Sequence, residues 1–277
     1  MNTKKMQGKT LGKKSAYLIS TLYEQNQTIF RLKDIRDILN TDAASAINFA
    51  RKLVNRHIVT RLKPGLFIII NYDLGMTKEF IGNEYIIAKE LINNKNYYIS
   101  HFSAMEIHGM ITQPQFTVYA VSIKKIRPVK IHGIKFKFIP ISKNEYFGYE
   151  SYWITKQDKI LISNLEKTIV DGFKNPQYCG GITEISKGVW INRKKINVDK
   201  LINYCIKINR GSVIRRLGYI MDIYNIVNTD KLIALQKQLT NTYSKLDPSL
   251  PASGKYLKKW RIQVNVSKDE LLKAIKT

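Results

Sequence analysis

The amino-acid sequence predicts an α+β protein with two domains, a small one over residues 1–75 and a larger mixed α/β domain over residues 76–277. Three observations lead to this prediction. A length of 277 residues favours two domains over one. Apolar residues recur at helical spacing in the first part, whereas several later segments alternate at strand spacing. Polar residues around Gly75, over 71–78, separate the two parts as a linker would.

The chain carries a large excess of positive charge. Lys and Arg number 46 against 21 Asp and Glu, which gives a formal net charge of +25. Such an excess favours a polyanionic partner, most often nucleic acid. A lysine-rich composition from an AT-biased genome would produce the same excess, so the charge alone leaves both explanations open.

The sequence predicts neither a membrane span nor a metal site. No stretch approaches the roughly 18 apolar residues of a membrane helix, and no apolar signal-peptide core follows the basic residues 1–10. The cysteines, Cys179 and Cys205, form no CxxC pair, so a structural zinc site is not expected. We therefore expect a soluble, cytoplasmic protein without metal or cofactor.

The first domain opens with helical signals. Residues 15–26 are predicted to be a helix, and Ile29-Phe30 a short extended piece. Leu32–Leu39 is predicted as a second short helix that ends at Asn40. A third helix is predicted over residues 41–57, because its apolar residues recur at spacings of three and four. These apolar residues are Ala43, Ala46, Ile47, Ala50, Leu53 and Val54.

A hairpin is predicted directly after the third helix. Val59–Leu62 and Leu66–Ile70 flank the turn Lys63-Pro64-Gly65. Proline fits the first central position of such a turn, and glycine fits the second, where φ is positive. Two short helices joined tightly form a helix-turn-helix, and a hairpin directly behind them forms the wing of a winged helix.

The face of the third helix opposite its apolar stripe suits DNA. It carries cations and amides but no acid. Asn and Arg side chains can pair with base edges, and Lys and Arg can neutralise phosphates. A hydrated helix face beside an ordinary hairpin is the alternative. The candidate DNA-binding residues of this helix and hairpin are Thr41, Ser45, Asn48, Arg51, Lys52, Asn55, Arg56, Arg61 and Lys63.

The second part alternates between helical and extended patterns. Helices are predicted over residues 80–92, 100–108, 165–173, 183–190, 198–208, 212–224 and 230–239, with a last one capped by Ser267. Strands are predicted over 115–122, 151–155, 159–162 and 260–266, and a hairpin over 129–139. Ser163-Asn-Leu-Glu166 fits the capping box of the helix at 165–173. His101 and His108 have no third ligand nearby, so packing or capping explains them better than a metal does.

Two basic groups in this part are candidate contact surfaces. Lys130, Lys135 and Lys137 share one face of the hairpin over 129–139, where they could contact nucleic acid or an acidic protein. A sheet with one hydrated face is the alternative. Arg215 and Arg216 could bind phosphate or a partner, although the Gly218 that follows could equally serve close helix packing.

The order of these motifs resembles the AbiEi family, the antitoxins of type IV toxin–antitoxin systems in phage abortive infection. The motifs are Tyr98-Ile-Ser-His-Phe-Ser-Ala104 with His108-Gly109, Ser163-Asn-Leu-Glu-Lys-Thr-Ile-Val-Asp171, Gly180-Gly181 and Arg215-Arg-Leu-Gly-Tyr219, after a winged helix. The resemblance spans roughly residues 15–225. It implies a winged helix that represses its own operon, and a C-terminal α/β domain needed for antitoxin activity. The implied partner is a separate nucleotidyltransferase toxin, opposed without a tight stable complex.

No catalytic residue is predicted. A nucleotidyltransferase needs paired carboxylates to hold Mg²⁺, and no Asp-x-Asp occurs in the chain. Glu166, Lys167 and Asp171 are explained by capping and by an i, i+4 ion pair. We expect a repressor that binds double-stranded operator DNA as two copies of a chain that is monomeric in solution. The alternatives are a nucleic-acid-processing enzyme and an RNA-binding module.

Overall fold

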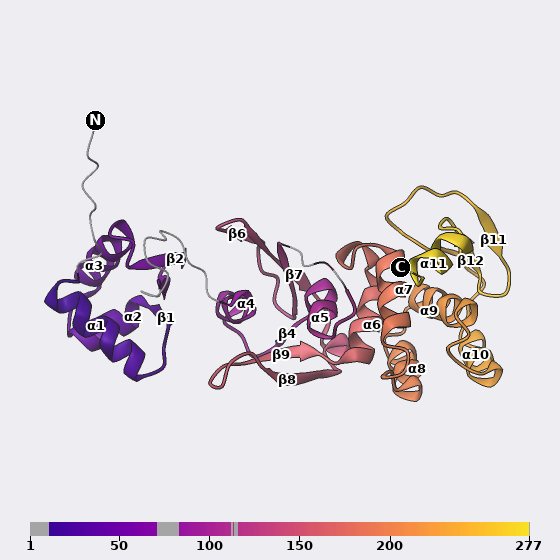
Figure 1. The fold of residues 1–277 in the computed structure, drawn as a ribbon, viewed down its shortest axis with the longest axis horizontal. Helices are drawn as coiled ribbons and strands as arrows, with labels where there is room; N and C mark the ends of the chain where they lie inside the picture. The colour runs from indigo at the N-terminus through magenta and orange to yellow at the C-terminus, as the bar shows by residue number, and fades with distance from the viewer. Residues whose placement is uncertain (1–10, 71–82, 112, 114–115, 277) are drawn as a thin grey trace. The chain divides into compact units, whose positions relative to one another are not determined.

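The computed structural model describes residues 11–70, 83–111, 113 and 116–276, and it is an α+β structure (Figure 1). Its contacts divide the chain into two compact units. The first comprises Met1–Asn93 with Ile154–Asp158, and the second comprises Asn94–Trp153 with Lys159–Thr277. The linker predicted over 71–78 lies outside the described residues. The contacts assign the helix after it to the first unit, so the units divide later than the expected residue 75.

The first unit combines four helices and a small sheet in its described part. The helices are α1 (Lys13–Glu24), α2 (Leu32–Leu39), α3 (Ala43–Asn55) and α4 (Glu84–Ile92). The strands are β1 (Ile29–Arg31), β2 (Val59–Lys63) and β3 (Leu66–Ile69), in the order β1-β3-β2. Both pairings are antiparallel, so the extended piece predicted at Ile29-Phe30 pairs with the predicted hairpin.

Local sequence signals explain the geometry of these elements. Asn40 adopts a φ of +45° at the end of α2, a conformation that Asn tolerates better than most residues. Asp42 caps α3 by accepting a hydrogen bond from the Ser45 backbone N–H at 2.9 Å. Gly65 has a φ of +76° in the β2–β3 turn, as the turn prediction requires. The core beneath contains Leu18, Leu22, Phe30, Ile35, Ala46, Ala50 and Leu53, all buried.

The second unit contains a six-stranded mixed sheet. Its strands are β4 (Tyr97–Ile99), β5 (Thr117–Ser122), β6 (Val129–Ile131), β7 (Ile134–Pro140), β8 (Tyr149–Trp153) and β9 (Lys159–Ser163). The order is β6-β7-β5-β4-β9-β8. The pairs β5–β7 and β4–β9 are parallel, and the other neighbours are antiparallel. The hairpin predicted around His132-Gly133 is confirmed as β6–β7.

The described part of the second unit also contains helices, of which the first two contact this sheet and the later ones extend away from it (Figure 1). They are α5 (His101–Ile107), α6 (Leu165–Lys174), α7 (Ile182–Ile191), α8 (Val198–Lys207), α9 (Gly211–Ile223), α10 (Thr229–Gln236) and α11 (Lys268–Ala274). Helix α6 contacts α5, α7, α8 and α9, and its residues from Glu166 to Phe173 are all buried. The largest core of the unit therefore surrounds α6.

Two details of the second unit differ from the predictions. The N-cap of α6 is Asn164, which accepts from the Lys167 backbone N–H at 3.0 Å, so the predicted cap at Ser163 is wrong by one residue. Strand β4 was not predicted, and a small sheet of β10 (Ser244–Lys245), β12 (Ile262–Val264) and β11 (Lys255–Leu257) contains two more strands that were not predicted. Strands of two or three residues are too short to show alternation. No helix in the described ranges is long and apolar enough to cross a membrane.

Candidate functional site

The outer face of α3 is the first candidate site. Ser45, Asn48, Arg51, Lys52 and Asn55 are exposed, and so is Arg56 directly after the helix. Ala46, Ala50 and Leu53 on the opposite side are buried in the core. The helix contains no acidic residue, so every charged side chain on its exposed face is a cation.

Asn48 and Arg51 are joined to each other on this face. The Nη2 of Arg51 donates a hydrogen bond to the Oδ1 of Asn48. A guanidinium has only donors, so this contact fixes the orientation of the Asn48 amide. The pair can therefore offer a ligand the amide nitrogen of Asn48 and the remaining nitrogens of Arg51, which all donate, and one lone pair of the Asn48 oxygen.

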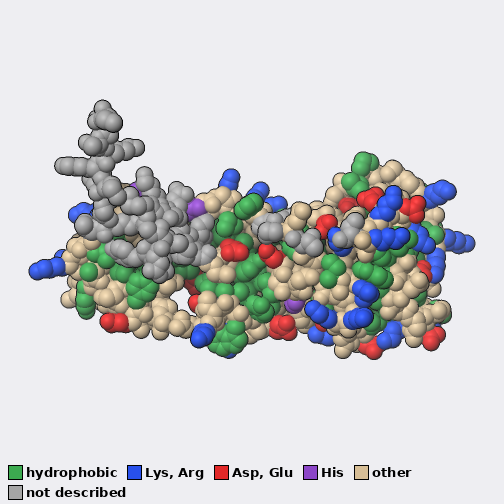
Figure 2. All heavy atoms as spheres, in the orientation of Figure 1, with side chains coloured by type: hydrophobic (Ala, Val, Ile, Leu, Met, Phe, Trp, Pro, Cys, Tyr) green, Lys and Arg blue, Asp and Glu red, His purple; other side chains and the backbone are tan. Residues whose placement is uncertain are grey.

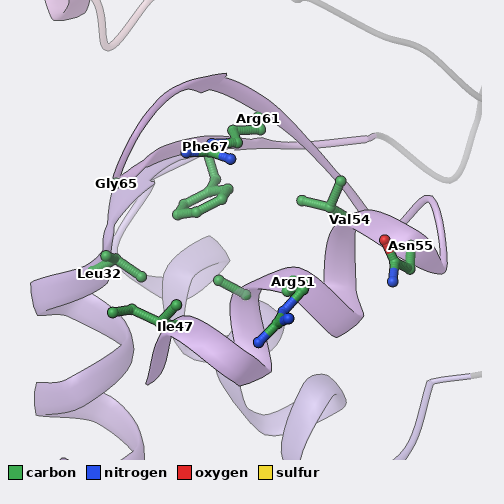
Figure 3. Close-up of a pocket in the computed structure, with 9 residues that line it drawn as sticks. Leu32, Ile47, Arg51, Val54, Asn55, Arg61, Gly65 and Phe67 are labelled. Atoms are coloured by element: carbon green, nitrogen blue, oxygen red, sulfur yellow. The ribbon is translucent and has the colours of Figure 1, made fainter. Parts of the chain in front are cut away.

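A groove runs between α3 and the β2–β3 hairpin (Figure 3). Its volume is about 320 Å³, and Phe67 extends into it from the hairpin toward the side chains of α3. Apolar side chains of α2, α3 and β3 alternate along its walls with the cations Arg51 and Arg61. The lining residues are Leu32, Ile47, Ala50, Arg51, Val54, Asn55, Arg61, Gly65 and Phe67.

Ile47 was wrongly predicted to belong to the buried apolar stripe of this helix. It was expected on the inner side, but its side chain is 50% exposed at the edge of the groove. The partly buried Phe49 packs against the core instead. The stripe is narrower than predicted because the hairpin and α2 leave the groove open rather than covering this flank of α3.

Three residues that were predicted to contact DNA are less available than expected. Ser45 and Lys63 form hydrogen bonds within the first unit, and Thr41 is half-buried. The Ser45 hydroxyl donates to Asp42 at 2.6 Å, and the hydrogen bonds from Ser45 lower the pKa of that carboxyl. The Lys63 ammonium donates to the Leu91 carbonyl of α4 at 2.9 Å. Burial, and secondly the charge of Arg31, lower the pKa of Lys63. Thr41 is half-buried between α2 and α3.

Lys63 was predicted to contact phosphate, and in the structure its ammonium lies on α4. Its Nζ lies on the last turn of α4, where the carbonyl groups carry partial negative charge. Arg31 attaches the same helix by donating to Glu90 at 2.9 Å and to Asn93 at 3.1 Å. Both cations therefore hold α4 on the first unit, and Arg61 is the exposed cation of the hairpin.

A second candidate site is the basic face of the β6–β7 hairpin. Lys130 and Lys135 pair across the hairpin and are exposed. Lys137 is half-buried, and its Nζ lies 5.5 Å from the centre of the Tyr119 ring and 5.6 Å from that of Tyr178. Phe116, 82% exposed, borders a hollow of about 460 Å³ that both Lys130 and Lys135 line.

Arg215 and Arg216 do not belong to any surface, which corrects the predicted contact surface. They are 2% and 5% exposed. Arg215 donates to the backbone and hydroxyl oxygens of Thr240 and to the Thr242 hydroxyl. Arg216 donates to the carbonyls of Phe173 and Lys245, at 2.8 and 3.2 Å. Burial lowers the pKa of Arg216 to about 10.

The physical reason is that the chain after residue 225 covers α9. Its last strands and α11 pack on this helix and its neighbours, and an added Cβ at Gly218 would collide with the Trp260 ring. The packing explanation for Gly218 is therefore the one that the structure supports. Acidic and cationic side chains are interspersed on the face of the second unit in Figure 2, rather than separated into one basic patch.

Two of the sequence motifs, the one at residues 98–104 and the one at residues 163–171, contribute to a buried polar cluster. Asp171 accepts from the Lys167 ammonium and, at 2.9 Å, from the Tyr98 hydroxyl. His101, with a φ of +51°, contacts the Ser100 hydroxyl at 2.8 Å, while its Nε2 has no hydrogen-bond partner. Burial lowers the pKa of His101 to about 4, so the ring is neutral. The predicted i, i+4 ion pair is confirmed, and it lies inside the core.

The cysteines of the described residues are buried. Cys179 and Cys205 are buried free thiols, and burial raises the pKa of Cys205 to about 12. A thiol with a raised pKa is a poor nucleophile. Within the described ranges, no three His, Cys, Asp or Glu side chains gather closely enough to hold a metal ion.

Comparison with known proteins gives a fold but no family. No family model matches the chain, and no curated protein matches it. The chain is similar to the crystal structure of the RV2827C protein from Mycobacterium tuberculosis, with a TM-score of 0.71 and 14% sequence identity over 98% of each chain. At this identity the likeness shows a shared fold along nearly the whole length, and nothing about function.

Proposed function

We propose that this chain binds duplex DNA through α3 and the β2–β3 hairpin, in the manner of a winged helix-turn-helix. The acid-free, exposed face of α3 is the observation that carries the proposal. Asn48, Arg51, Lys52 and Asn55 lie on it, and Arg61 faces it from across the groove. Following the AbiEi resemblance, we further propose that the DNA is an operator and that the protein represses its own operon.

The dimensions and charges of α3 support this proposal. Its 13 residues span about 20 Å, and a helix fits the major groove of B-DNA, which is about 12 Å wide. Arg51 and Asn48 suit base edges, whereas Lys52, Arg56 and Arg61 suit the flanking phosphates. A module of this size buries little surface on DNA. Two copies on adjacent half-sites would supply the affinity that one copy lacks.

The test is binding of the full chain to duplexes that it selects from a randomised DNA pool. Arg51→Ala should weaken binding to a selected duplex by about 1–3 kcal/mol and relax the sequence preference. Lys255→Ala, an exposed cation of the second unit, is the matched control and should change neither. Failure to enrich any sequence, or equal binding by Arg51→Ala, would refute the proposal.

We propose that antitoxin activity, which the AbiEi resemblance implies, belongs to the second unit and needs no catalysis by this chain. Lys130, Lys135 and Lys137 provide a basic surface there. Such a surface could compete with a nucleotidyltransferase toxin for its nucleic-acid substrate. Lys130→Glu with Lys135→Glu should abolish rescue of cells from the toxin while DNA binding by α3 persists. Full rescue by a normally folded double variant would contradict this assignment.

Phe116 favours a second candidate function, the binding of single-stranded nucleic acid. Its exposed ring beside Lys130 and Lys135 is the combination on which unpaired bases stack while cations hold the backbone. Binding of labelled tRNA and of duplex DNA, each with and without Mg²⁺, separates the candidates. Loss of tRNA binding in Phe116→Ala, with duplex binding retained, would favour this function. Turnover of either substrate would favour an enzyme.

A further inference from the structure

We infer that α3 reads a thymine next to a guanine, with Ile47 on the thymine methyl group and the Asn48–Arg51 pair on the guanine. The inference rests on the proposed DNA binding and names the base step that the site would select. It follows from two features described above: a pair of side chains that presents mainly donors, and an apolar side chain exposed one helical turn earlier.

The donor pattern of the pair selects guanine. Asn48 normally reads adenine by using its amide oxygen and nitrogen together, since adenine presents one donor and one acceptor in the major groove. Here Arg51 donates to the oxygen of Asn48, which leaves that oxygen one lone pair. Most of the groups that the pair can still offer are N–H donors, on the Arg51 guanidinium and the Asn48 amide. Guanine presents two adjacent acceptors, N7 and O6, in the major groove.

The contact also orients Arg51. An exposed arginine loses considerable side-chain freedom when it binds in one geometry. Asn48 holds the guanidinium before DNA arrives and, being neutral, leaves its charge intact. Asn48 is therefore a positioning residue for Arg51. Part of the side-chain entropy that Arg51 would lose on binding DNA is already lost in the free protein.

Ile47 supplies the apolar contact, which is with the thymine methyl group. Its side chain lies four residues before Arg51, so the two are neighbours on one helix face, about 6 Å apart at their Cβ atoms. Successive base pairs are about 3.4 Å apart, so the two side chains reach adjacent or nearly adjacent pairs. The thymine 5-methyl is the apolar group of the major groove, and Ile47 is the exposed apolar side chain of α3 beside Arg51.

The surroundings of Ile47 favour a methyl group over a polar edge. Leu32, Val54 and Phe67 line the same groove, and each is apolar. Arg51 and Arg61 beside it attract the phosphates that bring a base pair into reach. None of the groove-lining residues is acidic, so no carboxylate there would accept from the amino group of cytosine.

The test uses a duplex selected by the full-length protein from a randomised pool. Each thymine is replaced in turn by deoxyuridine, which lacks only the methyl group. Each guanine is replaced in turn by 7-deazaguanine, which lacks only the N7 acceptor. The parent should lose about fourfold in affinity at one uridine position, the value expected for one buried methyl-sized group. It should lose affinity at a neighbouring 7-deazaguanine position as well.

Protein variants assign each loss to a side chain. Ile47→Ala should bind the thymine and uridine duplexes with equal affinity. Arg51→Ala should bind the guanine and 7-deazaguanine duplexes with equal affinity. Ile206→Ala, an exposed isoleucine of α8, is the matched control and should respond as the parent does. Both tested side chains are exposed, and thermal melting checks that the variants fold. Asn48→Ala should weaken binding yet keep the response to 7-deazaguanine, because Arg51 remains.

Failure of the inference and failure of the proposed function give different results. If the parent selects a duplex but no uridine substitution weakens binding, Ile47 reads no methyl and the inference is wrong. The same holds if Ile47→Ala loses as much as the parent does at the uridine position. If the parent enriches no duplex at all, the proposed function fails and the inference fails with it.

Discussion

Gly218 is the residue on which the packing of α9 against Trp260 depends. Trp260 is fully buried, and an added Cβ at position 218 would overlap carbon atoms of its ring. An indole in a packed core has little room to move, since interiors are as dense as organic crystals. The helix can therefore approach the C-terminal segment closely only where it has no side chain.

We expect Gly218→Ala to lower the free energy of unfolding by about 3 kcal/mol, at the upper end of overpacking costs. Urea denaturation of the full chain measures it. Gly12→Ala is the control, because no heavy atom lies within 4 Å of the added Cβ, and it should stay within about 0.5 kcal/mol of the parent. A Gly218→Ala protein as stable as the control would show that the indole moves aside.

His101 makes stability depend on pH. Its pKa is about 4 in the folded protein, because burial disfavours the charged ring, and about 6.5 in an unfolded chain. Between these values the unfolded state binds the additional proton, so stability falls as the pH falls from about 6.5 to about 4. The full loss is about 3 kcal/mol. Above pH 6.5 this contribution is constant.

Comparison of unfolding at pH 7.5 and 4.5 measures this loss. His101→Asn should show a smaller difference between the two pH values, because it removes the titrating ring while Asn tolerates the φ of +51°. An unchanged difference in this variant would mean that other groups carry the pH dependence.

At the scale of the element, the two cations of the β2–β3 hairpin, Arg61 and Lys63, lie in different surroundings. Arg61 is exposed beside the groove, whereas the Lys63 ammonium is bonded to the Leu91 carbonyl. Each phosphate contact releases condensed counterions from DNA and steepens the salt dependence of binding. The Lys63 ammonium lies on α4 and does not line the groove, so we expect it to add less to that term than Arg61 does.

Arg61→Ala should therefore reduce the slope of log affinity against log salt by about one, while Lys63→Ala leaves the slope unchanged. Fluorescence anisotropy over a salt series, with a selected duplex, measures both. A reduced slope in Lys63→Ala would mean that this side chain leaves α4 when DNA binds.

At the scale of the whole molecule, α4 decides where the first unit ends. The ion pair of Arg31 with Glu90, and the Lys63–Leu91 contact, join it to the unit. A fragment of residues 1–93 should therefore melt at a higher temperature than a fragment of residues 1–75. Circular dichroism on both fragments checks this. Equal melting temperatures would show that α4 contributes nothing to the unit when it is alone.

Sequence reasoning reached those features that local signals specify. The Pro64-Gly65 turn, the αL end of α2 at Asn40 and the alternation of β7 are each written in a few adjacent residues, and the structure contains all three. Arg215 and Arg216 show the limit. Their spacing on α9 fits an exposed position, but the carbonyls and hydroxyls that bury them come from residues up to 43 positions away. No local pattern contains that information.

The groove beside Ile47 also could not be predicted from a local pattern. Its two walls come from α3 and from the hairpin, so its width is a property of their packing. The Asn48–Arg51 contact differs, since residues three apart on a helix are neighbours. That contact was accessible from the sequence, where both residues were predicted as separate readers.

The central place of α6 has a consequence for how the protein is made. A nascent chain emerges from the ribosome with its N-terminus first, and domains generally fold as units during synthesis. Apart from the short segment Ile154–Asp158, the first unit is complete once Asn93 has emerged. The partners of α6 extend to α9, which ends at Ile223, so the core around α6 is incomplete until then. A nascent chain thus carries a nearly finished N-terminal unit while the second waits for its last helices.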